Sequence, residues 1–348
     1  MSRMLGLSML FFIFSNVALA QWELQSTAPN GAAGDASLRG ISAVSAKIAW
    51  ASGSKGTVLR TLDGGKHWEK LTVPGAESLD FRDIQAFGGR TAFILAAGPG
   101  EQSRIYKTED GGSHWQLQFT NAEPKAFYDC FAFWDHEHGI AWSDPVNDRF
   151  LLLFTSDGSA WKPLVPDILL PALPGEGGFA ASGTCLIAQG KEDAWFVTGG
   201  SAARVFHSAN RGRTWSVVKA PLVSGKPSQG IFSIAFRDNK HGILVGGDYQ
   251  DPKAASGNAA LTEDGGETWK PAEKGPSGYR SAVAFIGGAS SLTAIAVGTS
   301  GSDYSVDGGK TWQPLDQNEY NAFSPAGRTG WAVGPHGRIA RLTKVPAK

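Results

Sequence analysis

The stretch Thr61-Leu62-Asp63-Gly64-Gly65-Lys66-His67-Trp68 occurs, with small variations, six times in this chain of 348 residues. Close copies begin at Thr108, Thr262 and Ser305, and weaker copies begin at Thr155 and Ser208. A repeat with a period of about 40 to 50 residues indicates a propeller or a solenoid. The aligned acidic or amide positions, which are separated by 47, 47, 53, 54 and 43 residues, are Asp63, Asp110, Asp157, Asn210, Asp264 and Asp307.

Each residue type in the octet suits a tight turn. An Asp side chain accepts hydrogen bonds from backbone N–H groups, the two Gly residues take positive φ values, and the Trp folds back over the hairpin. The octet resembles the Asp-box motif of sialidase-like and related β-propellers. Because six repeats need the same turn six times, we interpret the Asp and Asn residues of the boxes as structural.

Each repeat has the pattern of four short strands. In the second repeat Phe81–Phe87 alternates, Thr91–Ala97 is apolar, Arg104–Lys107 leads into the box, and Trp115–Phe119 follows it. After residue 20 no stretch has a sustained helical periodicity, and 45 Gly and 18 Pro separate strand-length segments. The sequence therefore predicts an all-β protein.

The two ends of the chain together supply one further blade. After Trp312 there are three more strands, the last at Arg338–Thr343, and the fourth strand is missing. Gln21-Trp22-Glu23-Leu24 has the pattern of that missing strand. We therefore predict one domain over residues 21–348, a seven-bladed β-propeller of four-stranded blades whose ring is closed by the N-terminal strand. Closure removes open sheet edges.

Residues 1–20 have the features of a cleavable secretory signal peptide. Arg3 is basic, Leu5–Phe14 is apolar, and Ala18-Leu19-Ala20 is a small-x-small cleavage site. The apolar run is too short for a transmembrane helix, and no Cys near the site supports a lipid anchor. We expect a periplasmic or secreted protein without membrane insertion.

The charges are balanced, with 32 Lys and Arg against 32 Asp and Glu, and neither sign forms a run. Nucleic-acid binding proteins carry a basic patch or stripe, which this sequence lacks. We expect a monomer that binds a protein partner or a small-molecule or glycan ligand, and no nucleic acid.

Cys130 and Cys185 are the only cysteines. Aligning the repeats places both on inner strands of adjacent blades, and an exported protein meets an oxidising compartment. A disulfide between the third and fourth blades is one interpretation. The other is that both are small buried apolar side chains.

The inner hairpins carry a second pattern, seen at Ala235–Gly242 and at Gly330–Gly337. It consists of an aromatic residue, an Asp turn, Gly, an apolar strand, Gly and then a box. From Trp22 to about Thr343 the chain resembles the photosystem II stability/assembly factor family of seven-bladed propellers, which has many non-photosynthetic bacterial relatives. The resemblance implies protein binding during complex assembly and no catalysis. The lipid-anchor Cys and a basic patch are absent from this sequence.

Three segments break the internal repeat: Ser143–Arg149, Leu173–Gly178 and Gly247–Lys253. Inter-blade connections and loops between second and third strands emerge on one face of a propeller, so we expect these segments to meet around the channel mouth. Loops on a rigid scaffold commonly carry binding residues, although Asp-Pro and Gly-Asp sequences also simply initiate turns. The candidate ligand-binding residues are Asp144, Asp148, Arg149, Glu176, Asp248 and Tyr249.

Two functions from different classes fit these residues. The first is a non-catalytic binding or assembly module. The second is a glycoside hydrolase, which would use two carboxylates drawn from Asp144, Glu176 and Asp248. A sialidase is disfavoured because the sequence lacks an arginine cluster and an Arg-Ile-Pro segment. The binding module is the function that the sequence favours.

We expect neither a metal nor a cofactor. His136 and His138 have a spacing that suits a metal, but the surrounding turn is repeated at Asp238–Gly242, where His241 aligns with His138 and nothing matches His136. A metal site needs three or four converging ligands. We therefore interpret this histidine pair as part of a turn.

Overall fold

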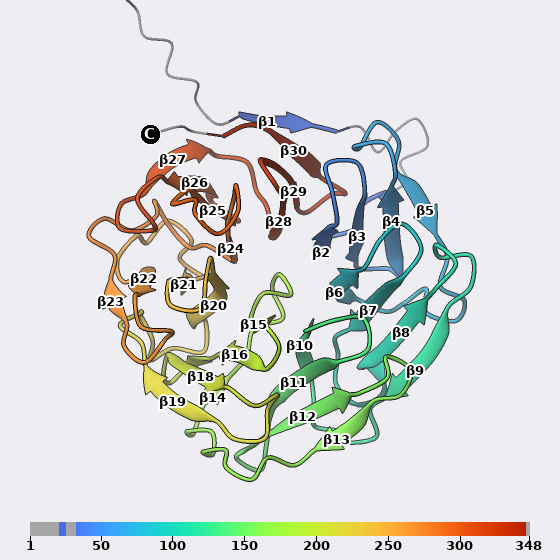
Figure 1. Cartoon of the computed structure of the whole chain (residues 1–348), viewed down its shortest axis with the longest axis horizontal. Helices are drawn as coiled ribbons and strands as arrows, with labels where there is room; N and C mark the ends of the chain where they lie inside the picture. Colours follow the sequence, from blue (N-terminus) through green and yellow to red (C-terminus); the bar gives the residue numbers. More distant parts are fainter. Residues whose placement is uncertain (1–20, 26–32, 346–348) are drawn as a thin grey trace, which may run out of the picture.

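The computed structural model describes residues 21–25 and 33–345, so the expected signal peptide lies outside the described residues. Seven antiparallel sheets surround a central channel, as Figure 1 shows. In the described part of the chain no helix has the length and apolar character needed to cross a membrane. A 3-10 turn, η1 (Gly100–Gln102), is the only helical element described.

Every blade has four strands, which are given below in order from the channel outward. Blades 1 to 4 consist of β2 (Leu38–Ala43), β3 (Ala49–Gly53), β4 (Thr57–Thr61), β5 (Glu69–Leu71); β6 (Phe81–Ala86), β7 (Ala92–Ala96), β8 (Arg104–Thr108), β9 (Gln116–Thr120); β10 (Tyr128–Phe133), β11 (Gly139–Val146), β12 (Arg149–Thr155), β13 (Lys162–Leu164); and β15 (Leu186–Gln189), β16 (Asp193–Val197), β18 (Arg204–Ser208), β19 (Ser216–Lys219). Blades 5 to 7 consist of β20 (Gln229–Phe236), β21 (Gly242–Asp248), β22 (Ala259–Thr262), β23 (Lys270–Pro271); β24 (Ala282–Phe285), β25 (Ala294–Gly298), β26 (Gly301–Ser305), β27 (Gln313–Asp316); and β28 (Ala322–Ala326), β29 (Thr329–Val333), β30 (Ile339–Lys344), β1 (Gln21–Leu24). Two short strands, β14 (Glu176–Gly177) and β17 (Gly199–Gly200), extend the sheet of blade 5.

The core lies between blades, because each sheet packs on both neighbours. Second strands such as β7 and β25 are buried along their whole length, which explains why they are continuous apolar runs and do not alternate. Aromatic stacking joins blades 3 and 4, where the rings of Trp142 and Phe196 lie 4.5 Å apart. Fourth strands are largely exposed.

The N-terminal strand closes the ring, as predicted. β1 pairs antiparallel with β30, with Trp22 opposite Leu342 and Leu24 opposite Ala340. In Figure 1 the two ends of the described chain lie side by side at this blade. The side chain of Gln25 then links blades 7 and 1, since its Oε1 accepts hydrogen bonds from the indoles of Trp331 (2.9 Å) and Trp68 (3.2 Å).

The Asp boxes form the turns between third and fourth strands. In the first box Asp63 Oδ1 accepts the hydroxyl of Thr61 (3.0 Å) and the N–H of His67 (3.0 Å), while Gly64 and Gly65 take φ values of 82° and 86°. Hydrogen bonds from His67 are the main cause that lowers the pKa of Asp63 to about 2. The carboxylate is satisfied within its own turn, which supports the structural interpretation.

A disulfide joins Cys130 and Cys185, whose Cα atoms are 6.1 Å apart. Both residues are fully buried in one apolar cluster with Trp142 and Phe196. The bond ties β10 of blade 3 to the chain just before β15 of blade 4. Blades 3 and 4 are thus fixed covalently next to the channel.

Candidate functional site

Four blades have a β-bulge at the same place near the start of the first strand. The pairing register shifts around Arg39 in blade 1, Arg82 in blade 2, Asp129 in blade 3 and Phe232 in blade 5. A bulge adds an unpaired residue and re-aims its side chain. All four side chains line one cavity at the channel mouth, on the face where the inter-blade connections emerge.

Two further blades place a side chain there from the corresponding position. Ser281 precedes β24 and donates its N–H to the carbonyl of Val297 (2.8 Å), and Asn321 precedes β28 and donates to Val333 (2.7 Å). Both residues line the same cavity. One backbone position, repeated around the ring, therefore supplies two arginines, an aspartate, a phenylalanine, a serine and an asparagine.

This mouth cavity has a volume of about 430 Å³ and two unlike sides. Blades 1 to 3 contribute the charged groups and one aromatic ring, that of Phe127, and blades 4 to 6 contribute the other aromatic rings. Its lining residues are Arg39, Arg82, Phe127, Asp129, Asp144, Gly178, Phe179, Ala180, Ala181, Phe232, Tyr249, Tyr279, Ser281, Thr299 and Asn321.

The two arginines differ in how they are satisfied. Arg82 donates from Nε to Asp80 (2.8 Å) and more weakly from Nη1 to the carbonyl of Ala180 (3.4 Å). Arg39 donates no hydrogen bond to any residue that the structure describes. Burial, followed by the charge of Arg82, lowers the pKa of Arg39 from its ordinary value, and both side chains line the mouth cavity. The mouth thus holds a half-buried guanidinium without a protein acceptor.

The two carboxyl groups of the mouth are both withdrawn from water. Asp129 is 1% exposed, and its Oδ2 has no hydrogen-bond partner among the described residues. Asp144 Oδ1 accepts the N–H of Gly178 (2.6 Å). Burial raises the pKa of both carboxyls, and the charge of Asp144 raises that of Asp129 further. Both carboxyls therefore resist ionisation in the protein alone, and a positive charge placed beside them would favour their ionised form.

The aromatic side is a packed wall. The rings of Phe179 and Phe232 stack at 3.8 Å, Tyr249 meets both edge-on at about 6 Å, and Tyr279 meets Phe232 edge-on at 4.7 Å. Tyr249 remains 46% exposed at the rim. The wall offers a flat apolar surface beside the charged groups.

Of the six predicted ligand-binding residues, Asp144 and Tyr249 line the mouth cavity. Asp148 has a φ of 61° in the tight turn between β11 and β12. Asp248 accepts the N–H of Gln250 (3.0 Å) and the side chain of Gln229 (3.1 Å), which fixes its loop. These two aspartates lie outside the residues that line the mouth.

The prediction that Glu176 binds a ligand is wrong, because its side chain is fully buried. It accepts hydrogen bonds from Arg204 Nε (2.8 Å), the hydroxyl of Thr198 (2.5 Å) and the N–H of Leu173 (2.8 Å). A buried carboxylate in this setting stabilises the long segment before blade 4. The structure therefore does not bring Glu176 and Asp248 together with Asp144 as a carboxylate pair in the mouth.

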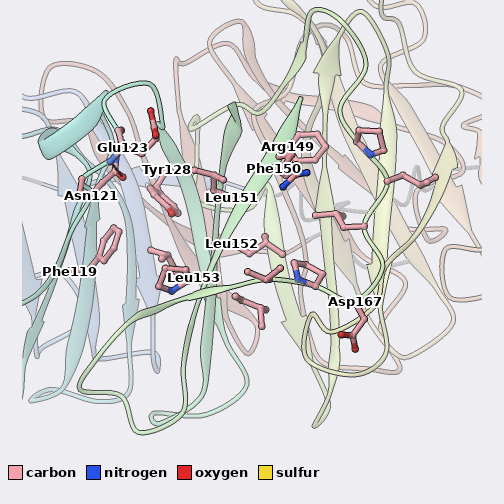
Figure 2. Close-up of a pocket in the computed structure, with 18 of the residues that line it drawn as sticks. Phe119, Asn121, Glu123, Tyr128, Arg149, Phe150, Leu151, Leu152, Leu153 and Asp167 are labelled. Atoms are coloured by element: carbon pink, nitrogen blue, oxygen red, sulfur yellow. Dashed lines mark hydrogen bonds between the residues drawn. The ribbon is translucent and has the colours of Figure 1, made fainter. Parts of the chain in front are cut away.

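Arg149 lies in a second cavity, a side groove of about 760 Å³ between the outer strands of blades 2 and 3. Strand β13 pairs only with Leu152, Leu153 and Phe154 of β12, so the edge of β12 at residues 149–151 is left without that neighbour. Figure 2 shows Phe119 and Glu123 on one side of this strand and Arg149 on the other. Because residues 149–153 all line the groove and alternate residues face opposite sides, the groove wraps over the strand edge.

The β11–β12 hairpin separates the side groove from the mouth cavity. Asp144, before the hairpin turn, lines the mouth, whereas Arg149, after it, lines the groove. The sector that the sequence predicted as one surface is therefore divided in two. The groove is mainly apolar, whereas the mouth combines charges with aromatic rings.

Most of the mouth was not predicted from the sequence, namely Arg39, Arg82, Asp129, Phe179, Phe232 and Tyr279. The predicted residues came from segments that break the repeat, whereas Arg39, Arg82, Asp129 and Phe232 stand in first strands that keep it. The available signal was the bulge position near the start of the first strands, where Arg39, Arg82, Asp129 and Phe232 differ in charge and size.

A cluster of Asp135, Glu137 and His138 brings possible ligand atoms within 4.8 Å of one another. Asp135 Oδ1 accepts the N–H groups of Glu137 (2.8 Å) and His138 (2.9 Å). Asp238 makes the same contacts in blade 5. The shared geometry supports turn chemistry for this cluster.

Comparisons with known proteins support the propeller and the repeat. Residues 303–314 match the BNR/Asp-box repeat. Among curated protein sequences none matches the chain. The fold is similar to that of YCF48 bound to D1 peptide, with a TM-score of 0.64, 14% identity, and coverage of 95% of this chain and 99% of that chain.

Two enzymes share the fold to a similar degree. Virginiamycin B lyase from Staphylococcus aureus has a TM-score of 0.65 at 14% identity, covering 93% of this chain and 99% of that chain. The GH74 xyloglucanase from Xanthomonas campestris has a TM-score of 0.60 at 16% identity, covering 92% of this chain and 53% of that chain. This chain spans about half the length of the xyloglucanase. At such identities the similarity concerns the fold alone.

Proposed function

We propose that this protein is an exported binding protein whose channel mouth receives a polypeptide segment or a small ligand. The observation that carries the proposal is a guanidinium group and a carboxyl oxygen, both without a protein partner, at one cavity. The half-buried Arg39 donates no side-chain hydrogen bond to a described residue and lines the cavity, and Asp129 has a buried oxygen without a partner. A buried polar group without a partner costs free energy, and a ligand that supplies the missing partner offsets this cost.

The mouth also has the build of a ligand site. It is concave, its apolar wall is a set of packed aromatic rings, and its few polar groups converge from separate blades. The side groove is larger but carries its polar groups, such as Glu123 and Asp167, around an apolar floor. A peptide-binding role for the loop face agrees with the YCF48 structure that contains a peptide, as an analogy of fold.

Export is part of the proposal. Residues 1–20 have the pattern of a signal peptide, with cleavage expected before Gln21. The disulfide between Cys130 and Cys185 fits an oxidising compartment such as the periplasm or the cell exterior. Amino-terminal sequencing of the mature protein, together with fractionation of the producing cells, tests this point.

A glycoside hydrolase is the second candidate, favoured by one observation. Asp129 and Asp144 are two carboxyls in one cavity with raised pKa values, as a general acid requires. The test is turnover on a panel of neutral glycans by the wild type and by Asp144→Asn. Turnover that Asp144→Asn abolishes would establish the hydrolase and replace the binding proposal.

The binding proposal is tested by affinity capture of partners and ligands from periplasmic extract, with mouth variants and matched controls. Tyr249→Ala and Arg39→Gln alter the mouth. Leu62→Ala and Arg90→Gln change an exposed apolar residue and an exposed arginine near the opposite face. We expect capture to fail for both mouth variants and to persist for both controls. Equal capture by all four would refute a site in the mouth.

A further inference from the structure

We propose that the ligand of the mouth is a zwitterion of the amino-acid type. Its carboxylate would pair with Arg39 and Arg82, its ammonium group with Asp129 and Asp144, and its apolar side chain would lie on the aromatic wall. This inference rests on the proposed function, because it names the ligand class of the same cavity.

The carboxylate end follows from the two guanidinium groups. Arg39 is free of protein acceptors among the described residues, and Arg82 uses Nε for Asp80 while its Nη1 contact with Ala180 is long at 3.4 Å. Guanidinium groups present a planar set of donors that matches a carboxylate in a two-point contact. A carboxylate placed between them also relieves the repulsion between the two cations.

The ammonium end follows from the two carboxyl groups on the neighbouring blade. Asp129 Oδ2 has no partner although the side chain is 1% exposed. Gly178 lies directly against this carboxyl, since a Cβ atom there would lie 2.8 Å from Asp129 Oδ2, so no side chain at position 178 fills the space that a ligand group would need. An ammonium group has three donors, enough to satisfy Asp129 and to reach Asp144 in the same cavity.

Both charges are needed on one ligand because both kinds of group share one small cavity. A purely anionic ligand leaves Asp129 without its partner, and a purely cationic ligand meets the unpaired charge of Arg39. A volume of about 430 Å³ holds a single small molecule or one terminal residue-sized group. The zwitterion satisfies both sides at once.

The apolar side chain of the ligand is inferred from the aromatic wall on the opposite side of the cavity. Phe179 and Phe232 form a flat stack that Tyr249 and Tyr279 enclose edge-on. Such rings favour an apolar or aromatic group, and they also attract a nearby ammonium ion. An amino acid with an aromatic side chain therefore fits the three surfaces together.

The test is isothermal titration calorimetry at neutral pH with three probes that share a ring. L-phenylalanine carries both charges, 3-phenylpropionate lacks the ammonium group, and 2-phenylethylamine lacks the carboxylate. We expect the wild type to bind L-phenylalanine at least about tenfold more tightly than either partial analogue, the equivalent of one lost charged contact. Equal affinity for 3-phenylpropionate would overturn the zwitterion in favour of an anion.

Variants test which residues contact the carboxylate of the ligand and which contact its ammonium group. Arg39→Gln should weaken the binding of L-phenylalanine and 3-phenylpropionate about tenfold and leave the binding of 2-phenylethylamine unchanged. Asp129→Asn should weaken only the binding of the two compounds that carry an ammonium group, L-phenylalanine and 2-phenylethylamine. Arg90→Gln is the control and should bind like the wild type. Asp144→Asn replaces Asp129→Asn if the latter melts early. A uniform effect of each variant on all three probes would contradict the assignment.

The failures of the inference and of the proposed function are distinguishable. If no probe binds but Tyr249→Ala and Arg39→Gln still abolish capture from extract, the zwitterion is refuted and the mouth remains the binding site. If no probe binds and capture is indifferent to the mouth variants, both are refuted.

Discussion

The Asp-box turns and the first-strand bulges are both repeated around the ring, but the repeat preserves different things in the two regions. In the turns both the backbone geometry and the residue types repeat, as the same contacts in the boxes of Asp63 and Asp264 show. At the bulges geometry repeats while chemistry changes, from Arg39 to Asp129 to Phe232. Turn side chains are satisfied locally, and bulge side chains face a cavity. A site can arise where the backbone is fixed and the side chain is free to vary.

The largest effect is expected at an arginine that is fully satisfied by the protein. Arg280 adjoins the mouth position of blade 6, is completely buried, and donates to Asp303 (2.6 Å) and Ser300 (2.9 Å). Arg280→Ala leaves Asp303 as an unpaired buried charge and should cost about 3–5 kcal/mol of unfolding free energy. Urea denaturation measures the loss. Arg39→Gln removes no side-chain hydrogen bond to a described residue, and the free energy of unfolding should change by no more than about 0.5 kcal/mol. Similar losses for both would show that Arg39 is also structural.

A smaller effect is expected in the boxes. Asp264 accepts the N–H of Thr268 (2.9 Å) and the hydroxyl of Thr262 (2.6 Å), but it is exposed, so water replaces part of what is lost. Asp264→Ala should therefore cost about 1 kcal/mol, with ligand capture unchanged. Thermal melting and the capture assay together check this. A variant that melts normally and loses capture would move the function to the boxes.

The smallest effect is a difference in pH dependence between the two regions. The pKa of Asp110 in a box is lowered to about 2, mainly by hydrogen bonds from His114, so its contribution is present above the unfolded value near 3.8 and lost as the pH falls towards 2. The raised pKa of Asp129 acts in the opposite sense. Its contribution to the free energy of unfolding is present below the unfolded-state pKa near 3.8 and is lost as the pH rises.

Melting temperatures between pH 2 and pH 8 separate these two contributions. Asp110→Asn should reduce the loss of stability on the acid side, and Asp129→Asn should reduce the decline on the neutral side. Identical profiles for the two variants would contradict the assigned pKa directions. His67→Gln, in another box, serves as a control that leaves Asp129 untouched.

The ring was predictable from sequence because its signals are local and repeated. The box spacing gave the blade period, and the pattern at Trp22 supplied the missing strand, which pairs with Leu342 as expected. The mouth was only partly predictable. Asp144 and Tyr249 were found because they stand in segments that depart from the repeat.

The rest of the site depends on features that a pattern of residue types does not contain. A bulge is a shift of register between strands, so the cavity-facing position of Arg39 becomes visible only once pairing is known. Glu176 looked accessible in a Gly-rich loop, but Arg204, 28 residues later in the chain, draws it into the interior. Long-range ion pairs of this kind leave no local trace in the sequence.

The central claim is that ligands meet the protein at the channel mouth and not at the turns or in the side groove. The most direct measurement is photocrosslinking with p-benzoylphenylalanine at three exposed positions, replacing Tyr249 in the mouth, Leu62 in a box or Val165 in the side groove. Intact-protein mass spectrometry after irradiation in periplasmic extract detects an adduct of any size. The account predicts adducts at position 249 alone. Adducts at position 62 or 165 with none at 249 would contradict it.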